Sequence, residues 1–320
     1  MTPENITKAI QEVLTEIDSS SYPANEVLNA YTRTRRYIGS KDRRAIRDGV
    51  WNTLRKRSWP KWLDKIVPKE ELSALHMEPQ IILRANGNRK EIQTKLAKEG
   101  IETEFTKLSP IGLILKKRIP LTTCKAYLEG KIEVQDEGSQ LIALATGIKA
   151  GDTVLDYCAG AGGKSLCFAQ MMKNKGRIVA HDISTKSLLE LRKRAERAEA
   201  KIIDISQNPT GFFDHVVVDA PCSGSGTWRR CPDAPFKLTP KILKDVQQKQ
   251  AKILDKACQY VAESGLLHYM TCSVIEGENQ IQMRAFLKRH KDFKLVHHAG
   301  WTPSKTNTDG FFLATFQKIR

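Results

Sequence analysis

The stretch Thr153-Val-Leu-Asp-Tyr-Cys-Ala-Gly-Ala-Gly-Gly-Lys164 decides the fold. Residues 153–156 form a short apolar run typical of a buried parallel strand, and a glycine-rich turn follows that opens a helix. Such a turn frees backbone N–H groups and lets a ligand approach the amino terminus of the helix closely. The turn has neither the dinucleotide-binding register nor the spacing of a P-loop. It therefore predicts a nucleotide-type site in an α/β fold and leaves the ligand open.

Around this turn, predicted strands and helices alternate from about Ile132 to the end of the chain. The alternation is typical of a parallel, doubly wound sheet, and a hairpin at its late edge is also compatible with the pattern. We predict strands at 153–155, 177–180, 201–203, 215–218, 266–270 and 311–317, and helices at 164–173, 186–198, 240–262 and 278–290. The fold class is therefore α/β, with a Rossmann-like domain over residues 149–320.

Two smaller units precede this domain. Residues 1–70 predict a basic helical domain, because their apolar residues recur at helical spacing. Its helices are expected near 6–17, 24–31 and 42–62. Residues 75–148 predict a small α+β module, with strands at 81–84, 102–105 and 112–115 and a helix at 90–98. A unit of this kind with a basic face commonly binds RNA, although similar folds also serve as spacers.

The chain is strongly basic, with 52 Lys and Arg against 36 Asp and Glu, a net charge of +16. Residues 31–65 hold twelve cations against three anions, so this segment alone carries +9. Four aromatic residues are interleaved with these charges: Tyr37, Trp51, Trp59 and Trp62. The charge density favours contact with phosphates, and the alternative is a solvated helix face over packed aromatics. Nucleic acid is therefore the expected partner.

The composition also excludes several classes. No apolar run approaches the ~18 residues of a membrane span, and the amino terminus lacks the apolar core of a signal peptide. The seven cysteines are an odd number without a Cys-x-x-Cys pair, so neither a disulfide framework nor structural zinc is expected. These features predict a cytoplasmic protein with reduced thiols, no metal and no membrane contact.

Two cysteines each close a short apolar strand and are each followed by serine. Cys222 lies in Asp219-Ala-Pro-Cys-Ser-Gly, and Cys272 lies in Tyr269-Met-Thr-Cys-Ser. Because reactive groups of an open α/β sheet gather at the carboxyl ends of its strands, we expect both thiols in one cleft. Two thiols beside a nucleotide-type turn indicate covalent chemistry with a bound cofactor.

Two acids at strand ends indicate which cofactor binds. Asp182 follows the strand after the glycine-rich turn, where a carboxylate can accept hydrogen bonds from both hydroxyls of a ribose; capping of the helix near Ser184 is the alternative. Asp204 ends the following strand, within reach of an adenine amino group, but an acid is also ordinary at the start of a loop. With no phosphate-specific motif, S-adenosylmethionine fits better than NAD or ATP.

Methylation of cytosine at carbon 5 requires this combination of groups. Addition of a thiolate to C6 makes C5 nucleophilic enough to accept a methyl group, and a base must then remove the C5 proton so that the thiol can leave. Asp219, three residues before Cys222, can contact the N3/N4 edge of the base. Lys164 is either a solvated lysine at a helix end or a cation near the cofactor or the target base.

These residues resemble the bacterial small-subunit rRNA cytosine-C5 methyltransferases of the Sun/Fmu type, relatives of nucleolar and NSUN-type RNA methyltransferases. The similar segments are Ile132–Leu141, Asp156–Ser165, Asp182, Asp219–Asp233, Thr271–Ser273 with Glu278-Asn279, and Thr308–Phe312. The resemblance covers nearly the whole chain. The turn departs from the family's usual Ala-Ala-Pro, since Ala159-Gly160-Ala161 stands there.

The resemblance implies a class I methyltransferase domain after an RNA-recognition-like module and an N-terminal domain similar to the antiterminator NusB. It implies Cys272 as nucleophile and Cys222 as the thiol that assists release, whereas a Pro-Cys nucleophile, as in DNA cytosine methyltransferases, would select Cys222. The implied catalytic residues are Cys272, Cys222, Asp219 and Lys164. The implied cofactor contacts are Cys158, Ala159, Gly160, Ala161, Gly162, Gly163, Lys164, Asp182, Asp204 and Asp219.

We therefore expect an S-adenosylmethionine-dependent RNA cytosine-C5 methyltransferase that acts on small-subunit rRNA, or on the assembling subunit, as a monomer. The target base must leave its stack before the thiol and the methyl donor can reach it. Two alternatives remain open at this point. One is a tRNA cytosine-C5 methyltransferase, and the other is a non-catalytic RNA-binding factor in ribosome assembly.

Overall fold

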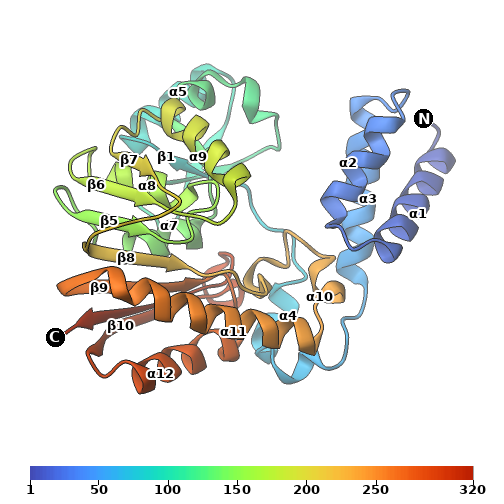
Figure 1. The fold of residues 1–320 in the computed structure, drawn as a ribbon. Helices are drawn as coiled ribbons and strands as arrows, with labels where there is room; N and C mark the ends of the chain where they lie inside the picture. Colours follow the sequence, from blue (N-terminus) through green and yellow to red (C-terminus); the bar gives the residue numbers. More distant parts are fainter. Residues whose placement is uncertain (320) are drawn as a thin grey trace.

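The apolar run at Thr153 becomes a central strand of a seven-stranded sheet in the computed structural model, which describes residues 1–319 (Figure 1). In spatial order the strands are β10 (Phe293–Trp301), β11 (Phe311–Lys318), β9 (Val261–Thr271), β8 (Phe213–Asp219), β5 (Thr153–Asp156), β6 (Arg177–Ala180) and β7 (Ile203–Ile205). Strands β5 to β9 are parallel, and β11 runs antiparallel to both of its neighbours. The predicted Rossmann-like α/β architecture is confirmed, and the late hairpin is present as β10 and β11.

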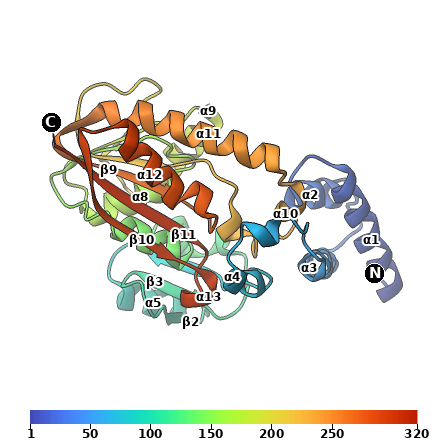
Figure 2. The same ribbon diagram turned by 90° about the horizontal axis from the view of Figure 1, so that it is seen from below.

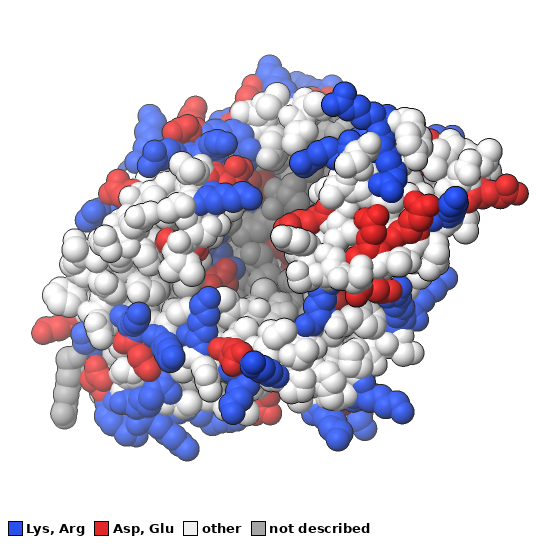
Figure 3. Space-filling view, turned by 45° about the vertical axis from the view of Figure 1, so that its right-hand side comes forward, with Lys and Arg blue, Asp and Glu red and all other residues white. Residues whose placement is uncertain are grey.

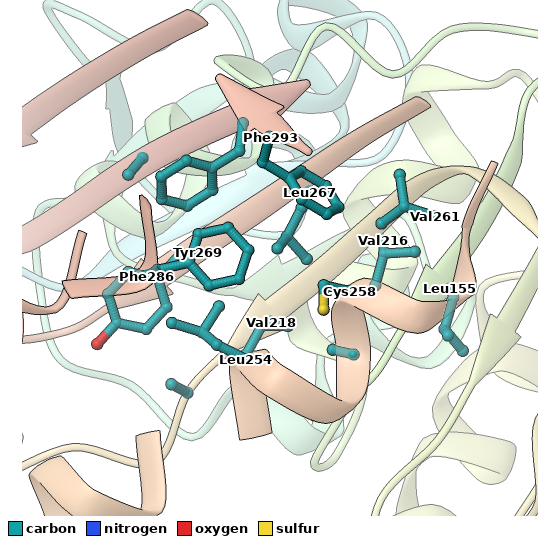
Figure 4. Packing of buried hydrophobic residues seen from close by; sticks show 14 of the residues in the cluster. Leu155, Val216, Val218, Leu254, Cys258, Val261, Leu267, Tyr269, Phe286 and Phe293 are labelled. Carbon is teal, nitrogen blue, oxygen red and sulfur yellow. The ribbon is translucent and has the colours of Figure 1, made fainter. Parts of the chain in front are cut away.

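Helices cover both faces of this sheet (Figures 1 and 2). The helices are α7 (Glu137–Leu144), α8 (Gly163–Met171) and α9 (Thr185–Arg197) on one face, and α11 (Pro240–Ala257) and α12 (Gln280–Arg289) on the other. Successive strand residues point to opposite faces, so Val154 packs toward α8 while Leu155 belongs to the cluster under α11. Figure 4 shows this second cluster, where Leu254 and Phe286 from the two helices meet Val218 and Tyr269 from the sheet.

Two predicted boundaries within the sheet are wrong for a tertiary reason. The helix predicted at 240–262 ends at Ala257, and β9 begins already at Val261, because Val261 pairs with Phe213 on β8. Strand β7 lies at 203–205 instead of 201–203, since Ile203 pairs with Ile178 on β6. In both cases pairing with a neighbouring strand overrides the local pattern.

The small module has the order β1 (Ile82–Ala85), α5 (Arg89–Lys98), β2 (Thr103–Phe105), β3 (Gly112–Leu115), α6 (Lys125–Leu128) and β4 (Ile132–Val134). Its antiparallel strands are arranged β2-β3-β1-β4, which is the ferredoxin-like βαββαβ pattern. Leu83 and Leu113 on one face of the sheet pack on α5. The other face lies against the large domain, because Arg84 donates to the carbonyl oxygen of Gly163 at 3.0 Å.

Two domain limits differ from those predicted. Helix α7 packs into the core of the large domain through Ile142 and Ala143, so the small module ends near residue 135 and not at 148. The helical unit consists of α1 (Pro3–Ser19), α2 (Ala24–Thr34) and α3 (Ser40–Lys56), around a core of its own. The segment after it, with the short helices Leu63–Lys65 and α4 (Lys69–Ala74), packs instead on Trp228, Val274 and Ile275 of the large domain.

No helix within residues 1–319 combines the length and the apolar character that crossing a membrane requires.

Docking of the small module on the large domain depends on Glu133, whose side chain is 3% exposed and bonds Arg194 at 3.0 Å and also Arg197. We expect Glu133→Gln to lower the free energy of unfolding by about 2 kcal/mol, because it leaves two partly buried guanidinium groups without their anion. Urea denaturation followed by fluorescence measures this. Glu129→Gln, which removes only an exposed pair with Lys125, is the control. Equal urea midpoints for the two variants would contradict this account.

Candidate active site

The two cysteines meet at the carboxyl edge of the sheet. Cys222 follows β8 and Cys272 follows β9, and these strands are parallel neighbours in register through Asp219 and Met270. Their sulfur atoms lie 3.3 Å apart. The structure thus brings together the two thiols that the sequence placed in one cleft.

The loop after Cys222 crosses the loop after Cys272 at Gly226. The Gly226 N–H donates to the carbonyl oxygen of Cys272 at 3.0 Å, and the Gly226 carbonyl accepts from the N–H of Gly310 at 2.8 Å. A Cβ atom at Gly226 would lie 2.1 Å from the Gly310 carbonyl oxygen, closer than any side chain allows. Glycine is therefore required here for the Cys222 loop to approach the turn before β11.

A buried ion pair lies beside the thiols. The Lys164 ammonium, 8% exposed, donates to Asp219 Oδ2 at 2.5 Å. Burial alone would lower the pKa of Lys164, but the Asp219 carboxylate more than offsets this and the pKa ends above its ordinary value. Negative charge on Cys272 also raises the pKa of Lys164. Lys164 is therefore not a solvated lysine at a helix end.

The environment distinguishes the two thiols. The hydrogen bond to Cys272, followed by burial, raises the pKa of the Cys222 thiol well above its ordinary value. A thiol with a raised pKa is a poor nucleophile, so this environment disfavours Cys222 as an attacking sulfur.

A pocket of about 620 Å³ adjoins these groups at the carboxyl ends of β5, β6 and β8. Its lining residues are Tyr157, Cys158, His181, Asp182, Ile183, Ser184, Asp219, Pro221, Lys249, Lys252, Ile253 and Lys256. Asp182 accepts from the Gly160 N–H at 2.8 Å through one oxygen and from the Ser184 N–H at 2.8 Å through the other. It thus holds the turn before α9, whose N-cap is Ser184, and it still has free lone pairs toward the pocket.

Contacts from β1 and α9 hold the glycine-rich turn in place. Gly160 and Gly162 have φ values of +52° and +81°, which favour glycine, and a Cβ on Gly162 would lie 2.6 Å from Leu191. The carbonyl oxygen of Ala161 accepts from Arg194 at 2.7 Å, and Gly163 accepts from Arg84. The buried Ala159 packs with α9.

Cys158 lines the pocket, but its environment opposes a reactive role. Burial and then the nearby negative charges of Asp156, Asp219 and Asp182 raise the pKa of the Cys158 thiol. We therefore expect it to remain a neutral thiol that only shapes the wall of the pocket.

Asp204 lies outside this pocket, so the position predicted for it is wrong. It occupies the middle of the edge strand β7, and its exposed carboxylate accepts from Arg177 at 3.0 Å. The strand runs two residues further than expected, to Ile205, so Asp204 lies within the strand and not after it.

Several residues of the site escaped the sequence analysis. Ile183, 83% exposed beside Asp182, offers an apolar surface at the mouth of the pocket. Lys249, Lys252 and Lys256 line the same pocket from one face of α11, and their spacing of three and four residues was the available signal. Glu278 lies in a segment that resembles the family, but its contacts with both cysteine loops were not predicted.

The comparisons with known proteins identify the family. The family model described as 16S rRNA methyltransferase RsmB/F matches residues 143–317, more than half of the chain. A probable ribosomal RNA small subunit methyltransferase B from Bacillus subtilis is 31% identical over 318 residues, covering 86% of this chain and 69% of the relative. The chain belongs to the RsmB/F family. It spans about two thirds of the length of the curated relatives it matches.

Solved structures agree with this assignment. A protein crystallised as PH0851 has a TM-score of 0.78 to this RsmB/F family member at 27% identity, covering 92% of this chain and 76% of its own. The crystal structure of NSun6 from Pyrococcus horikoshii with SFG has a TM-score of 0.71 at 19% identity, covering 78% of this chain and 94% of its own. The second likeness concerns the fold alone. The chain is thus a methyltransferase by family, and its fold is shared with both of these structures.

One buried acid of the RsmB/F site gives a pH-dependent prediction. Burial raises the pKa of Asp156 to about 7, although a hydrogen bond from Ser165 at 2.6 Å opposes this. Between pH 3.8 and about 7 the folded protein keeps a proton that the unfolded chain has lost, so stability falls as the pH rises. We expect Asp156→Asn to remove a slope of about 1.4 kcal/mol per pH unit from this window.

Urea unfolding at several pH values, without cofactor, measures the slope. Asp245→Asn on the exposed surface of α11 is the control and should retain it. If the slope were the same in Asp156→Asn and in the unmodified chain, the buried carboxyl would not be its source.

Proposed function

We propose that this RsmB/F family member methylates carbon 5 of a cytosine in small-subunit rRNA, with S-adenosylmethionine as methyl donor. The observation that carries the proposal is the pair of sulfur atoms 3.3 Å apart beside the Lys164–Asp219 ion pair. Small-molecule and protein methyltransferases need neither a second active-site thiol nor a net charge of +16. The names of the relatives support small-subunit rRNA as the substrate.

The pocket fits S-adenosylmethionine. Asp182 can accept hydrogen bonds from ribose hydroxyls through its free lone pairs, and the exposed Ile183 offers an apolar surface to an adenine ring. The Asp156 carboxyl has one buried oxygen without a hydrogen-bond partner next to the glycine-rich turn. When bound, S-adenosylmethionine supplies an electrophilic methyl group.

The two thiols divide the chemistry between them. The Cys272 thiolate adds to C6 of the cytosine, so that a C6–S bond forms and the electron pair of the C5–C6 double bond moves toward C5. Asp219 and Lys164 contact the polar edge of the base and hold it against the thiols. After methylation a base takes the C5 proton, the C5–H electron pair re-forms the C5–C6 double bond, and the C6–S bond breaks with its electrons returning to the Cys272 sulfur. Cys222, in contact with the Cys272 sulfur, assists this release.

RNA reaches the site along basic surfaces. Figure 3 shows a hollow between the helical unit and the large domain, with Lys and Arg side chains and some acidic ones around its rim. Three exposed cations at the start of α3 and in the turn before it form no ion pair within residues 1–319: Arg36, Lys41 and Arg44. The sheet of the small module offers less surface for RNA binding than its topology suggests, because one face lies against the large domain. We therefore assign most of the phosphate contact to the helical unit.

The mechanism predicts opposite behaviour of two variants. We expect Cys272→Ala to lower methyl transfer by at least about three orders of magnitude and to form no covalent RNA complex, because the attacking atom is absent. We expect Cys222→Ala to accumulate a covalent complex, because addition proceeds and release is slowed. Transfer from labelled cofactor to small-subunit rRNA and denaturing gels measure both effects.

Cys231→Ala is the matched control, since Cys231 is an exposed thiol that contacts neither Cys222 nor Cys272. A covalent complex in Cys272→Ala and none in Cys222→Ala would reverse the two roles. Label that appears in tRNA and not in rRNA would retain the chemistry and refute the substrate.

The basic turn predicts a change in salt dependence. We expect the triple variant Arg36→Gln, Lys41→Gln, Arg44→Gln to weaken RNA binding and to reduce the slope of log K against log salt by about 2. Fluorescence anisotropy with an rRNA fragment measures the slope. The triple variant Lys288→Gln, Lys291→Gln, Lys294→Gln, on exposed positions around the end of α12, should leave it unchanged. Equal slopes for the two variants would exclude the helical unit as the main phosphate contact.

A further inference from the structure

Glu278 is a fully buried carboxylate between the two cysteine loops. It ends the short helix Glu276–Glu278 that follows the Cys272 loop, and it is 0% exposed. No Lys, Arg or His among the described residues forms an ion pair with it. Its charge is therefore balanced only by hydrogen-bond donors.

Those donors come from three elements. The carboxylate accepts from the Ser223 N–H at 2.8 Å and from the Ser223 hydroxyl. It also accepts from the Ser273 hydroxyl at 2.6 Å and from Gln250 Nε2 at 3.0 Å. The Glu278 carbonyl oxygen accepts from the Tyr269 hydroxyl at 2.6 Å. Three of these four contacts to the carboxylate thus come from residues that directly follow Cys222 or Cys272.

The contacts hold both sulfur atoms in place through their neighbours. Ser223 directly follows Cys222, and Ser273 directly follows Cys272. Gln250 also donates to the carbonyl oxygen of Pro221, the residue before Cys222, at 3.1 Å. The residues before and after Cys222 are therefore both held by hydrogen bonds. The Glu278 carboxylate also holds Ser273, the residue after Cys272.

A purely structural explanation does not account for a charge at this point. Burial of a carboxylate without a cation is costly, and a neutral side chain of similar size would avoid that cost. A charged carboxylate has two effects at this position that a neutral side chain would not have. Four charge-assisted hydrogen bonds hold the loops, and a negative potential reaches the adjacent sulfur atom.

We propose that Glu278 is the positioning residue of the two thiols: its carboxylate holds the Cys222 and Cys272 loops together, and its negative charge reserves attack on the base for Cys272. The assignment of attack rests on the proposed function. The clamp itself rests on the geometry alone.

The charges around the sulfur atoms agree with this division. Besides the Cys272 hydrogen bond and burial, the negative charges of Cys272 and Glu278 raise the pKa of Cys222. The other titratable group close to Cys222 is the Tyr269 phenol, whose own pKa is raised by burial, so it remains neutral. Negative charge on Cys272 raises the pKa of Lys164, so this cation interacts favourably with that sulfur. The Glu278 carboxylate, in contrast, disfavours a thiolate on Cys222.

The first test needs neither RNA nor methyl transfer. Alkylation of the cofactor-free protein by iodoacetamide at neutral pH, read by peptide mass spectrometry, gives the rates at Cys222 and Cys272. In Glu278→Gln we expect the ratio of the Cys222 rate to the Cys272 rate to rise about tenfold, because a charge that disfavours the Cys222 thiolate is lost. The matched control is Glu276→Gln, which removes an exposed carboxylate two residues away. Equal acceleration at both cysteines, or none, would overturn the electrostatic role.

The second test measures whether the sulfur atoms stay together. Phenylarsine oxide bridges two thiols only when they are close, and Cys222→Ala defines its affinity without the pair. We expect Glu278→Gln to weaken this binding about tenfold or more, the loss expected when a charge-assisted hydrogen bond is removed. Unchanged affinity would overturn the clamp.

The third test separates this proposal from the proposed function. In Glu278→Gln we expect kcat for RNA methylation to fall about 10- to 100-fold, while KM for RNA and cofactor affinity stay within about twofold. Glu278 lines neither the cofactor pocket nor the basic turn. A parallel loss of cofactor affinity would indicate general loosening and refute a specific positioning role. Absence of methyl transfer to RNA by the unmodified protein, in contrast, would refute the proposed function and leave both thiol tests valid.

Two further variants are available if Glu278→Gln does not fold. Ser223→Ala removes a hydroxyl contact on the Cys222 side, and Ser273→Ala removes one on the Cys272 side. Each leaves the other donors of Glu278 in place. Either variant should weaken phenylarsine oxide binding, and retained affinity in both would overturn the clamp.

Discussion

The parallel pairing of β8 with β9 is the constraint on which the rest of the site depends. Register through Asp219 and Met270 makes the two strands end side by side, so the loops that carry Cys222 and Cys272 leave the sheet at adjacent points. A shift by one residue would turn every side chain on one strand to the opposite face. The buried apolar residues on both faces of β8 oppose such a shift. Core packing between β8 and β9 thus sets the distance between the sulfur atoms of Cys222 and Cys272.

Buried charge holds the loops where the strands leave them. Asp309, 1% exposed, accepts from Arg229 at 2.6 Å, and Arg230 reaches Asp136 at 2.7 Å. These side chains come from the Cys222 loop, the turn before β11 and the segment before α7. Since removal of one partner would leave an uncompensated buried charge, the cluster opposes any independent movement of these loops. Glu278 opposes loop movement in the same way: if its neutral donors moved away, a buried carboxylate would be left without compensation.

Sequence reasoning succeeded where function depends on residues at the ends of strands with strong apolar patterns. The strands before Asp156, Asp219 and Cys272 have such patterns, and parallel topology then brings their ends together. It failed where long-range pairing decides. The edge strand β10 contains polar and exposed residues such as His297 and His298 and becomes a strand only by pairing with β11. Asp204 was misplaced because the three-residue strand β7 has no boundary signal of its own.

The attachment of the helical unit explains why a basic domain at the chain's start can serve this site. Asp233, eleven residues after Cys222, accepts from the N–H of Ala24 at 2.9 Å at the start of α2. Arg55 donates to the carbonyl oxygen of Arg229 at 3.2 Å, and Trp59 packs edge-on against Trp228 with ring centroids 5.1 Å apart. The helical unit is therefore docked on the segment that carries Cys222, and not on a distant surface of the domain. The basic surface of the unit is consequently fixed relative to the thiols, because the segment that carries Cys222 also holds the unit.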